Sequence, residues 1–185
     1  AIDTYQRLLI NDSESLDYLL AIGQAHWNLK ELDKARSTYI KALEVDPENT
    51  NIMYKLGVIE IDQNRSNKAV NYFLNALSCN DPTVSILYQL AMAYGNLGKF
   101  MQASIALQNA LSLSPNDIEI KYQLAIAYKE MGAYNPAINY MLDYLQKYPE
   151  DSIGNFILGQ LYLNANNYDN ALFTFKKSYN INPEN

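Results

Sequence analysis

The amino-acid sequence repeats itself with a period of 34 residues from residue 16 onward, five times and without an insertion or deletion. A small residue returns at the eighth position of each repeat, namely Gly23, Gly57, Ala91, Ala125 and Gly159. Alanine returns at the twentieth position, as Ala35, Ala69, Ala103, Ala137 and Ala171. A period of this length is typical of chains that stack copies of one small unit. Because such a stack presents an extended surface, the period favours holding a partner over enclosing a catalytic pocket.

Each repeat carries the pattern of two helices. Positions 4, 7, 8 and 11 are spaced as one face of a helix, and positions 20, 24 and 27 as one face of a second. A proline near position 32 cannot continue a helix and is expected to end the second one. These prolines are Pro47, Pro115, Pro149 and Pro183, and Pro82 misses the position by one residue. Asp33, Asn67 and Asp169, all at position 18, are the expected N-caps of second helices.

The residues at these positions are those of a known repeat family. In the first unit, positions 4, 7, 8 and 11 read Leu19, Ile22, Gly23 and His26. The sequence resembles the tetratricopeptide repeat, whose pattern is W-x2-L-G-x2-Y, then A-x3-F, then P. The resemblance implies an all-α fold, a right-handed superhelical solenoid of helix–turn–helix units. The units are 16–49, 50–83, 84–117, 118–151 and 152–185. Residues 1–15 fit the second helix of a truncated preceding repeat, which predicts a fragment of a longer protein.

Composition argues against several classes of partner. The net charge is −6, with 20 acidic and 14 basic residues interspersed along the chain. Nucleic acid is not an expected partner, because phosphate binding needs a clustered basic face. The longest uncharged stretches are too short and too polar to span a bilayer, so no direct membrane insertion is expected. An intracellular, cytoplasmic location is favoured, with the periplasm or an organelle as alternatives.

Catalytic chemistry is not indicated. The chain has one histidine and one cysteine, so neither a nucleophile–base pair nor a metal cluster emerges from the sequence. His26 is expected to be a packing residue, and Cys79 a small hydrophobic residue of the core. We therefore expect no enzyme, no catalytic residue, no metal site and no cofactor.

Glu60 is the unusual acid of the sequence. It occupies position 11 of the second unit, where tyrosine is usual, and the same unit carries Ser66 where other units have a large apolar residue. The first interpretation is a locally loose repeat in which Glu60 reaches solvent or pairs with a lysine. The alternative is a bend or a partner contact at this unit.

The resemblance implies that the first helices of the units line a concave groove, with positions 5, 6 and 9 pointing into it. Position 9 is usually polar but holds apolar residues in the three central units, beside aromatic residues at position 5. Gly95 leaves room at the centre of this stripe. The predicted partner-binding residues are Tyr54, Lys55, Val58, Tyr88, Gln89, Met92, Tyr122, Gln123, Ile126 and Phe156. We expect a scaffold or adaptor that binds an apolar peptide or amphipathic helix of a partner protein.

Other readings of the same residues stay open. The apolar stripe is also explained if another part of a parent chain, or self-association, covers it. The repeats are also compatible with the substrate-presenting arm of a multidomain enzyme such as a glycosyltransferase. A third reading is a scaffold that self-associates through uncapped ends. The Lys/Asn/Arg clamp with which some members of the family grip C-terminal carboxylates is not expected, because the required positions hold other residue types.

Overall fold

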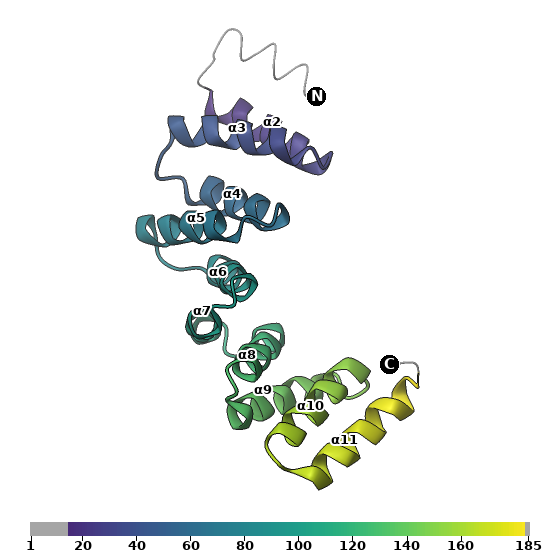
Figure 1. The fold of residues 1–185 in the computed structure, drawn as a ribbon. Coiled ribbons are helices and arrows are strands. Elements are labelled where there is room, and N and C mark those ends of the chain that lie inside the picture. Colours follow the sequence, from purple (N-terminus) through teal and green to yellow (C-terminus); the bar gives the residue numbers. More distant parts are fainter. Residues whose placement is uncertain (1–14, 184–185) are drawn as a thin grey trace. The chain divides into compact units, whose positions relative to one another are not determined.

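The structure is a computed structural model that describes residues 15–183, and these residues form ten helices and no strand. Consecutive helices pack side by side in five pairs (Figure 1). The pairs are α2 (Leu16–Asn28) with α3 (Leu32–Val45), α4 (Thr50–Asp62) with α5 (Ser66–Cys79), α6 (Val84–Asn96) with α7 (Phe100–Leu113), α8 (Ile118–Glu130) with α9 (Tyr134–Lys147), and α10 (Ser152–Asn164) with α11 (Tyr168–Ile181). The predicted all-α array of helix–turn–helix units is confirmed. The helix expected within residues 1–15 lies outside the described residues, apart from Ser15, which precedes α2.

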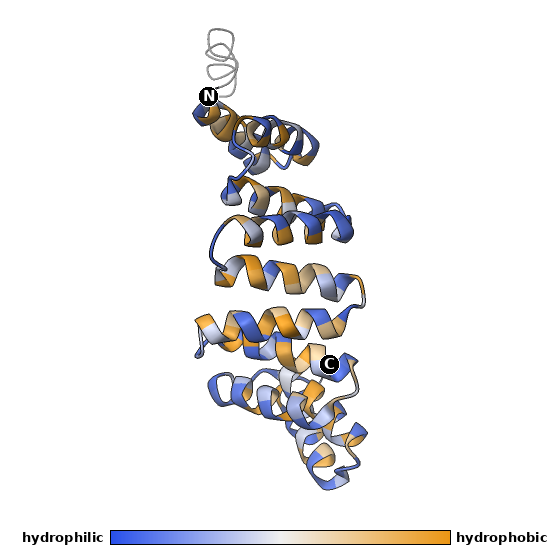
Figure 2. Ribbon diagram, turned by 90° about the vertical axis from the view of Figure 1, so that its left-hand side faces the viewer, coloured by the Kyte–Doolittle hydropathy of each residue, from blue (hydrophilic) through white to orange (hydrophobic). Residues whose placement is uncertain are grey.

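The chain divides into two compact units after Pro82. In the described residues, the first unit contains α2 to α5 and the second contains α6 to α11. The division falls at the proline that departs from the periodic position. Each helix mixes apolar and polar residues, visible as orange and blue along the ribbons of Figure 2. The apolar residues of each unit meet in its own core.

The first helices begin at side-chain caps that recur with the period. The oxygens of Asn49, Thr83, Asp117 and Asp151 each accept a hydrogen bond from a backbone N–H two or three residues further on. Such a cap satisfies an amide that has no partner inside the helix. All four residues occupy position 34 of the repeat, so the last residue of one unit starts the first helix of the next.

The predicted N-caps of the second helices are wrong. Helices α3, α5 and α11 begin one residue before Asp33, Asn67 and Asp169, so these residues lie in the first turn. The reason is the short connection, in which position 15 is left-handed in every pair. These residues are Lys30, Asn64, Gly98, Gly132 and Asn166, with φ between 57° and 73°. A left-handed residue reverses the chain quickly, so the second helix starts earlier than its polar residues suggest.

The small residue at position 8 is explained by the side chain at position 24. A Cβ atom built on Gly23 would lie 2.6 Å from the ring of Tyr39, and one built on Gly159 would lie 2.6 Å from the ring of Phe175. Where position 24 is aliphatic instead, position 8 is alanine, as in the pair Ala91 and Leu107. The two positions therefore share one volume inside each helix pair.

The core of each unit is built from these contacts. In the first unit the buried cluster includes Leu19, Tyr39, Ile52, Leu56 and Ile59. In the second unit a cluster joins α8, α9 and α10. Its buried members are Ala125, Ala137, Ile138, Met141, Leu145, Leu158 and Leu161. Within each unit, neighbouring helix pairs therefore bury each other's apolar faces.

Cys79 is not a core residue. Its side chain is exposed. It is the last residue of α5, and the residues at the same position in α3 and α7, Val45 and Leu113, are exposed as well. The helix end points this position away from the neighbouring pair, so an apolar residue type at this position did not indicate burial.

Candidate functional site

The predicted partner-binding residues are divided between the two units. Tyr54, Lys55 and Val58 lie on α4 in the first unit, and the other seven lie on α6, α8 and α10 in the second. Nine of the ten are half-buried, and Phe156 is exposed. A half-buried side chain packs on its own helix pair and leaves part of its surface accessible to solvent. We call the seven residues of the second unit the first-helix surface, that is Tyr88, Gln89, Met92, Tyr122, Gln123, Ile126 and Phe156.

In the first unit, Lys55 sits among polar and aromatic groups from α2 and α3. Its Nζ atom donates a hydrogen bond to Gln24 Oε1 at 2.7 Å and lies 5.1 Å from the centre of the Trp27 ring. The ring of Tyr39 is 5.8 Å away. Burial lowers the pKa of the Lys55 ammonium. The amide oxygen and the ring faces hold the cation in place without a carboxylate among its recorded contacts.

The aromatic residue beside it, Tyr54, is partly structural. Its ring packs against Phe73 of α5, with 6.2 Å between ring centres. Val58, one turn further along α4, is half-buried. Sequence reasoning selected Tyr54, Lys55 and Val58 but passed over Trp27 and Gln24 as their neighbours. Those contacts join residues 28 and 31 positions apart in the chain, a separation that no helical spacing reveals.

In the second unit, two predicted residues converge on an acid that was not predicted. The hydroxyl of Tyr88 on α6 donates to Glu119 Oε1 at 3.5 Å, and Gln123 Nε2 donates to the same oxygen at 3.3 Å. Burial, followed by the charge of Glu119, raises the pKa of Tyr88. Glu119 sits at position 2 of its unit and is exposed. It therefore places a negative charge at the edge of the first-helix surface.

A chain of three tyrosines extends the first-helix surface onto α9. The rings of Tyr122 and Tyr144 have centres 4.8 Å apart, and those of Tyr144 and Tyr148 are 5.2 Å apart. The Tyr144 hydroxyl donates to Asp151 Oδ2 at 2.9 Å. Burial, with Asp151 beside it, raises the pKa of Tyr144 to about 12. Tyr144 lies on α9 and Tyr148 directly follows that helix. The sequence prediction missed both because it considered only residues of the first helix of each pair.

The remaining residues of the first-helix surface differ in how far they belong to the core. Ile126 packs against the buried cluster of the second unit. Phe156 is 41% exposed and contacts Phe175, with 5.5 Å between ring centres. Met92 and Gln89 are half-buried. A Cβ atom on Gly95 would meet no atom within 4 Å, so the surface is open at this glycine.

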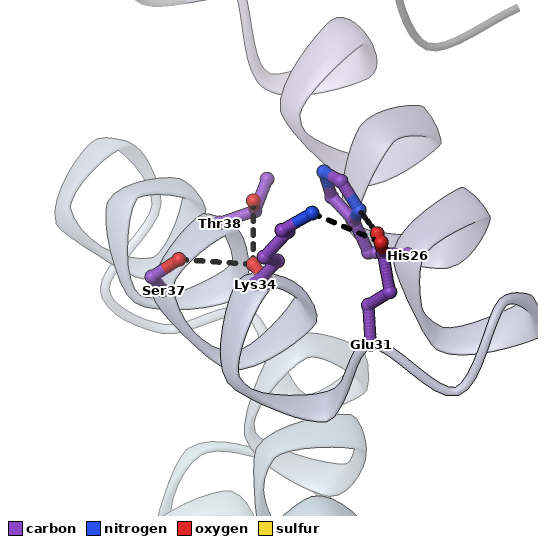
Figure 3. A network of polar contacts seen from close by, with 5 residues as sticks. All are labelled: His26, Glu31, Lys34, Ser37 and Thr38. Atoms are coloured by element: carbon purple, nitrogen blue, oxygen red, sulfur yellow. Dashed lines mark hydrogen bonds and ion pairs between the residues drawn. The ribbon is translucent and has the colours of Figure 1, made fainter.

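His26 is a buried packing residue, as expected. It is 7% exposed, and its Nδ1 atom lies 2.6 Å from Glu31 Oε2 (Figure 3). Lys34 donates to the other oxygen of Glu31 at 2.9 Å, and this contact, followed by the one with His26, lowers the pKa of Glu31. The three side chains connect the end of α2 to the start of α3.

The first interpretation of Glu60 is wrong, and the alternative of a bend or partner contact at this unit stays a prediction. Glu60 neither reaches solvent nor pairs with a lysine, because its side chain is fully buried and held by two arginines. Its two oxygens each lie 2.5 Å from an Nε atom, one of Arg36 on α3 and one of Arg65 before α5. The hydrogen bond to Glu60 raises the pKa of Arg36. Arg36 is 24 residues away in the chain, so only the packing of α3 on α4 brings the pair together.

Within residues 15–183, no group of three or more histidine, cysteine or acidic side chains is arranged to hold a metal ion. No helix among the same residues has both the length and the apolar character needed to cross a bilayer.

Comparisons with known proteins agree with the architecture. No curated protein matches the chain. The solved structure of YrrB, described as a TPR protein with an unusual peptide-binding site, has a TM-score of 0.89 at 22% identity, over 100% of this chain and 95% of that one. A MamA structure has a TM-score of 0.86 at 24% identity, over 93% and 94% of the two chains. MamA from Desulfovibrio magneticus RS-1 reaches 0.85 at 16% identity, over 91% and 96%. At these identities the likeness establishes the fold.

Family models cover nearly the whole repeat region. One model of the tetratricopeptide repeat matches residues 16–49, 50–80, 84–117 and 154–185, and a second model of the same repeat matches residues 119–151. Together with the five helix pairs and the recurring small residue against position 24, these matches assign the fold to its family. This chain belongs to the tetratricopeptide repeat family.

Proposed function

We propose that this chain is a non-catalytic interaction module, which binds an extended or helical segment of a partner protein on its first-helix surface. The observation that carries the proposal is the row of partly exposed aromatic and aliphatic side chains on successive first helices. Phe156 is exposed, and Tyr88, Met92 and Tyr122 are half-buried. Apolar surface rimmed by polar groups is typical of interaction sites. Membership of a repeat family whose stacked helices present extended surfaces supports the same function.

The chemistry of the surface suggests how a partner is held. Aromatic side chains already packed on their own helices lose little freedom when a partner covers them, so they are suited to be energetic anchors. Gln89 and Gln123 offer amide groups beside the rings. The open space at Gly95 accommodates a bulky side chain or the backbone of a bound segment. The YrrB structure, described as having a peptide-binding site, makes a peptide-like segment the first ligand to test.

Lys55 adds a polar feature in the first unit. Its ammonium group has amide and aromatic neighbours and a pKa lowered by burial. A carboxylate of a partner, brought close to this group, would offset that desolvation. We therefore expect a partner segment to carry an acidic residue wherever it meets Lys55.

Site-specific photo-crosslinking tests this proposal. A photoreactive phenylalanine analogue replaces Gln89 on the first-helix surface, or Gln102, which is exposed on α7, as the matched control. In lysate of the source organism, a discrete crosslinked protein is expected from the Gln89 position alone. Adding Met92→Glu to the Gln89 variant is expected to remove that product, because a buried carboxylate without a partner opposes apolar docking. Equal crosslinking from both positions, or none from Gln89, would reject the first-helix surface as the binding site.

A further inference from the structure

The second unit contains a cavity that the first-helix surface does not include. It lies between α9 and α11 over α10 and has a volume of about 310 Å³. Its walls are largely apolar, and Phe173 and Leu142 at its mouth are 70% and 39% exposed. The lining residues include Leu142, Leu158, Tyr162, Phe173, Thr174 and Lys177.

The equivalent place in two other helix pairs is filled by a tyrosine ring from position 23. In the first unit, Tyr72 on α5 packs against the buried cluster formed with α3 and α4. In the second unit, Tyr140 on α9 stacks on Tyr128 of α8, with 5.9 Å between ring centres and 5° between ring planes. At the cavity, position 23 is Thr174, whose hydroxyl donates to the Asn170 backbone oxygen. The cavity thus includes the repeat position at which those two helix pairs carry a tyrosine ring.

The cavity retains the counterpart of one ring of the Tyr128–Tyr140 stack. Tyr162 on α10 is the counterpart of Tyr128 on α8, one period later. It is half-buried and packs against the core of the second unit. Phe173 replaces Asn139 of the preceding pair, so the mouth is more apolar than its filled counterpart. The cavity therefore offers an aromatic face and apolar walls to a ring.

The charges around the cavity also differ from those around Tyr140 in the preceding helix pair. There, Lys121 and Asp143 form an ion pair, with Nζ 2.7 Å from Oδ2. One period later these positions hold Asn155 and Lys177. The side-chain amide of Asn155 donates two hydrogen bonds, to the backbone oxygens of Pro149 and Asp151 before α10. Lys177 forms no recorded ion pair within residues 15–183, so its positive charge stands at the cavity without a carboxylate.

We propose that this cavity binds an aromatic side chain of a partner protein that has an acidic residue next to it in its own sequence. The ring stacks on Tyr162 as Tyr140 stacks on Tyr128, and the acidic group pairs with Lys177. The volume lies at the lower end of the range for ligand pockets, about 300–1,000 Å³, and is sufficient for an aromatic side chain. Aromatic residues are favoured anchors at such sites because they bury much area in few rotamers. The proposal does not depend on the first-helix surface, which shares no residue with the cavity.

Methyl NMR of the whole chain tests this proposal with three short blocked peptides. Each peptide has glycines around a central pair, which is Tyr-Asp, Leu-Asp or Tyr-Asn. With the Tyr-Asp peptide, the methyl signals of Leu142, Leu145 and Leu158 are expected to shift upfield, because a stacked ring lies over them. The Leu-Asp peptide should cause no ring-current shift. The Tyr-Asn peptide should bind about threefold more weakly, the range expected for one exposed ion pair.

Two variants assign the binding to the cavity. Thr174→Tyr should fill it as Tyr140 fills the neighbouring groove and abolish the shifts, whereas Asn109→Tyr adds the same ring at an exposed position of α7 and should leave them intact. Lys177→Gln should make the Tyr-Asp and Tyr-Asn peptides bind equally. If Thr174→Tyr fails to fold, Phe173→Asp at the exposed mouth serves in its place.

Several outcomes would overturn the proposal. These are no methyl shift with the Tyr-Asp peptide, the same shifts with the Leu-Asp peptide, or shifts that survive Thr174→Tyr. Cavity methyl signals that move with protein concentration in the absence of peptide would identify a second copy as the occupant. Met92→Glu should leave the peptide titration unchanged. The result for the cavity is therefore independent of whether the first-helix surface binds a partner.

Discussion

Single residues in this protein take their roles from neighbours on other helices. Glu60 is an acid at a tyrosine position, yet it is fully buried because Arg36 and Arg65 reach it from two directions. Tyr39 is also fully buried, at the centre of the first unit. For both residues, the energetic consequence of substitution depends on the surrounding groups and differs from what the residue type suggests.

Replacing Glu60 tests the buried cluster. Glu60→Gln leaves two arginines without their carboxylate, and removing one partner of a buried ion pair typically costs about 3–5 kcal/mol. We expect a loss of about 3 kcal/mol in the free energy of unfolding of the first unit, measured by urea denaturation. Glu119→Gln, at an exposed acid, is the control and should change stability by less than about 0.5 kcal/mol. A similar small effect at both positions would show that the cluster contributes little.

The raised pKa of Tyr39 predicts a loss of stability at alkaline pH. Burial raises its pKa from 10.0 to about 12, so between these values the unfolded chain releases a proton that the folded chain retains. Stability therefore falls as the pH rises through this window, by about 2 kcal/mol at its upper end for this group. Tyr39→Phe should fold, because Phe73 occupies the same position in the next pair. The variant should lose less stability than the parent between pH 10 and 12 in urea denaturation, and parallel curves would contradict the assignment.

Each helix pair behaves as an element with its own internal fit. The volume at position 8 and the side chain at position 24 are matched, with glycine against an aromatic ring or alanine against an aliphatic group. The connection between the helices needs a left-handed residue at position 15, which is glycine in two units and a larger residue in three. The matched volumes and the left-handed turn each predict how a substitution changes stability, in cases where the type or exposure of the residue alone would not.

The match inside α4 and α5 can be tested by a double-mutant cycle. A Cβ atom on Gly57 would overlap the ring of Phe73, so Gly57→Ala should destabilise the first unit by about 2 kcal/mol. Phe73→Leu recreates the pairing of Ala91 with Leu107 and should recover at least about 1 kcal/mol as coupling energy. Gly95→Ala meets no atom within 4 Å and, as the control, should stabilise its helix by up to about 1 kcal/mol. Additive effects of the two substitutions would refute the matched-volume explanation.

The turn between α2 and α3 carries avoidable strain. Lys30 has φ of 61°, a conformation that costs a residue with a Cβ roughly 1–2 kcal/mol. Lys30→Gly should therefore stabilise the first unit by about 0.5–1 kcal/mol, after the greater freedom of glycine in the unfolded chain is subtracted. The control is Lys41→Gly, the same substitution inside α3, which should lower the free energy of unfolding by about 1 kcal/mol. Thermal unfolding of the two variants and the parent makes the comparison. Destabilisation by both variants would mean that Lys30 is not strained.

At the scale of the whole molecule, the last helix presents an apolar face. Tyr168, Leu172 and Tyr179 of α11 are 62%, 57% and 63% exposed. The residues one period earlier on α9 include Ile138 and Leu145, which are buried where α10 packs on α9. The face of α11 therefore has the chemistry of a surface that a further helix covers, and we propose that it supports self-association.

Sedimentation velocity over a wide range of protein concentration tests this proposal. We expect the chain to form dimers or larger species as concentration rises, because apolar helix faces of this kind bury each other. Leu172→Glu should shift the chain toward monomer by placing a charge in the contact, and Asp169→Glu, an exposed position on the same helix, should not. A chain that stays monomeric throughout the range, or a Leu172→Glu variant that associates as strongly, would exclude the face as a contact.

The sequence alone was sufficient for the architecture. The 34-residue period, the small residue at position 8 and the prolines after the second helices predicted an all-α array of helix–turn–helix units, and this prediction is confirmed. The reason is local: helical spacing, helix-ending residues and repeated small residues act over a few positions of the chain, so their pattern is visible in the order of residues. The burial of His26 followed from the same pattern, and the ten predicted partner-binding residues stay a prediction.

Tertiary structure decided whatever depends on residues far apart in the chain. The partners of Glu60, the exposure of Cys79 and the neighbours of Lys55 were all missed, because each is set by one helix packing on another. The early start of α3, α5 and α11 came from the left-handed turn, which the sequence marks clearly only at Gly98 and Gly132. The cavity beside Thr174 exists because α9, α10 and α11 bring its lining residues together, with a small side chain where two other helix pairs carry a tyrosine. Such a volume has no signature in a single stretch of sequence, since it is made of side chains that only the fold brings together.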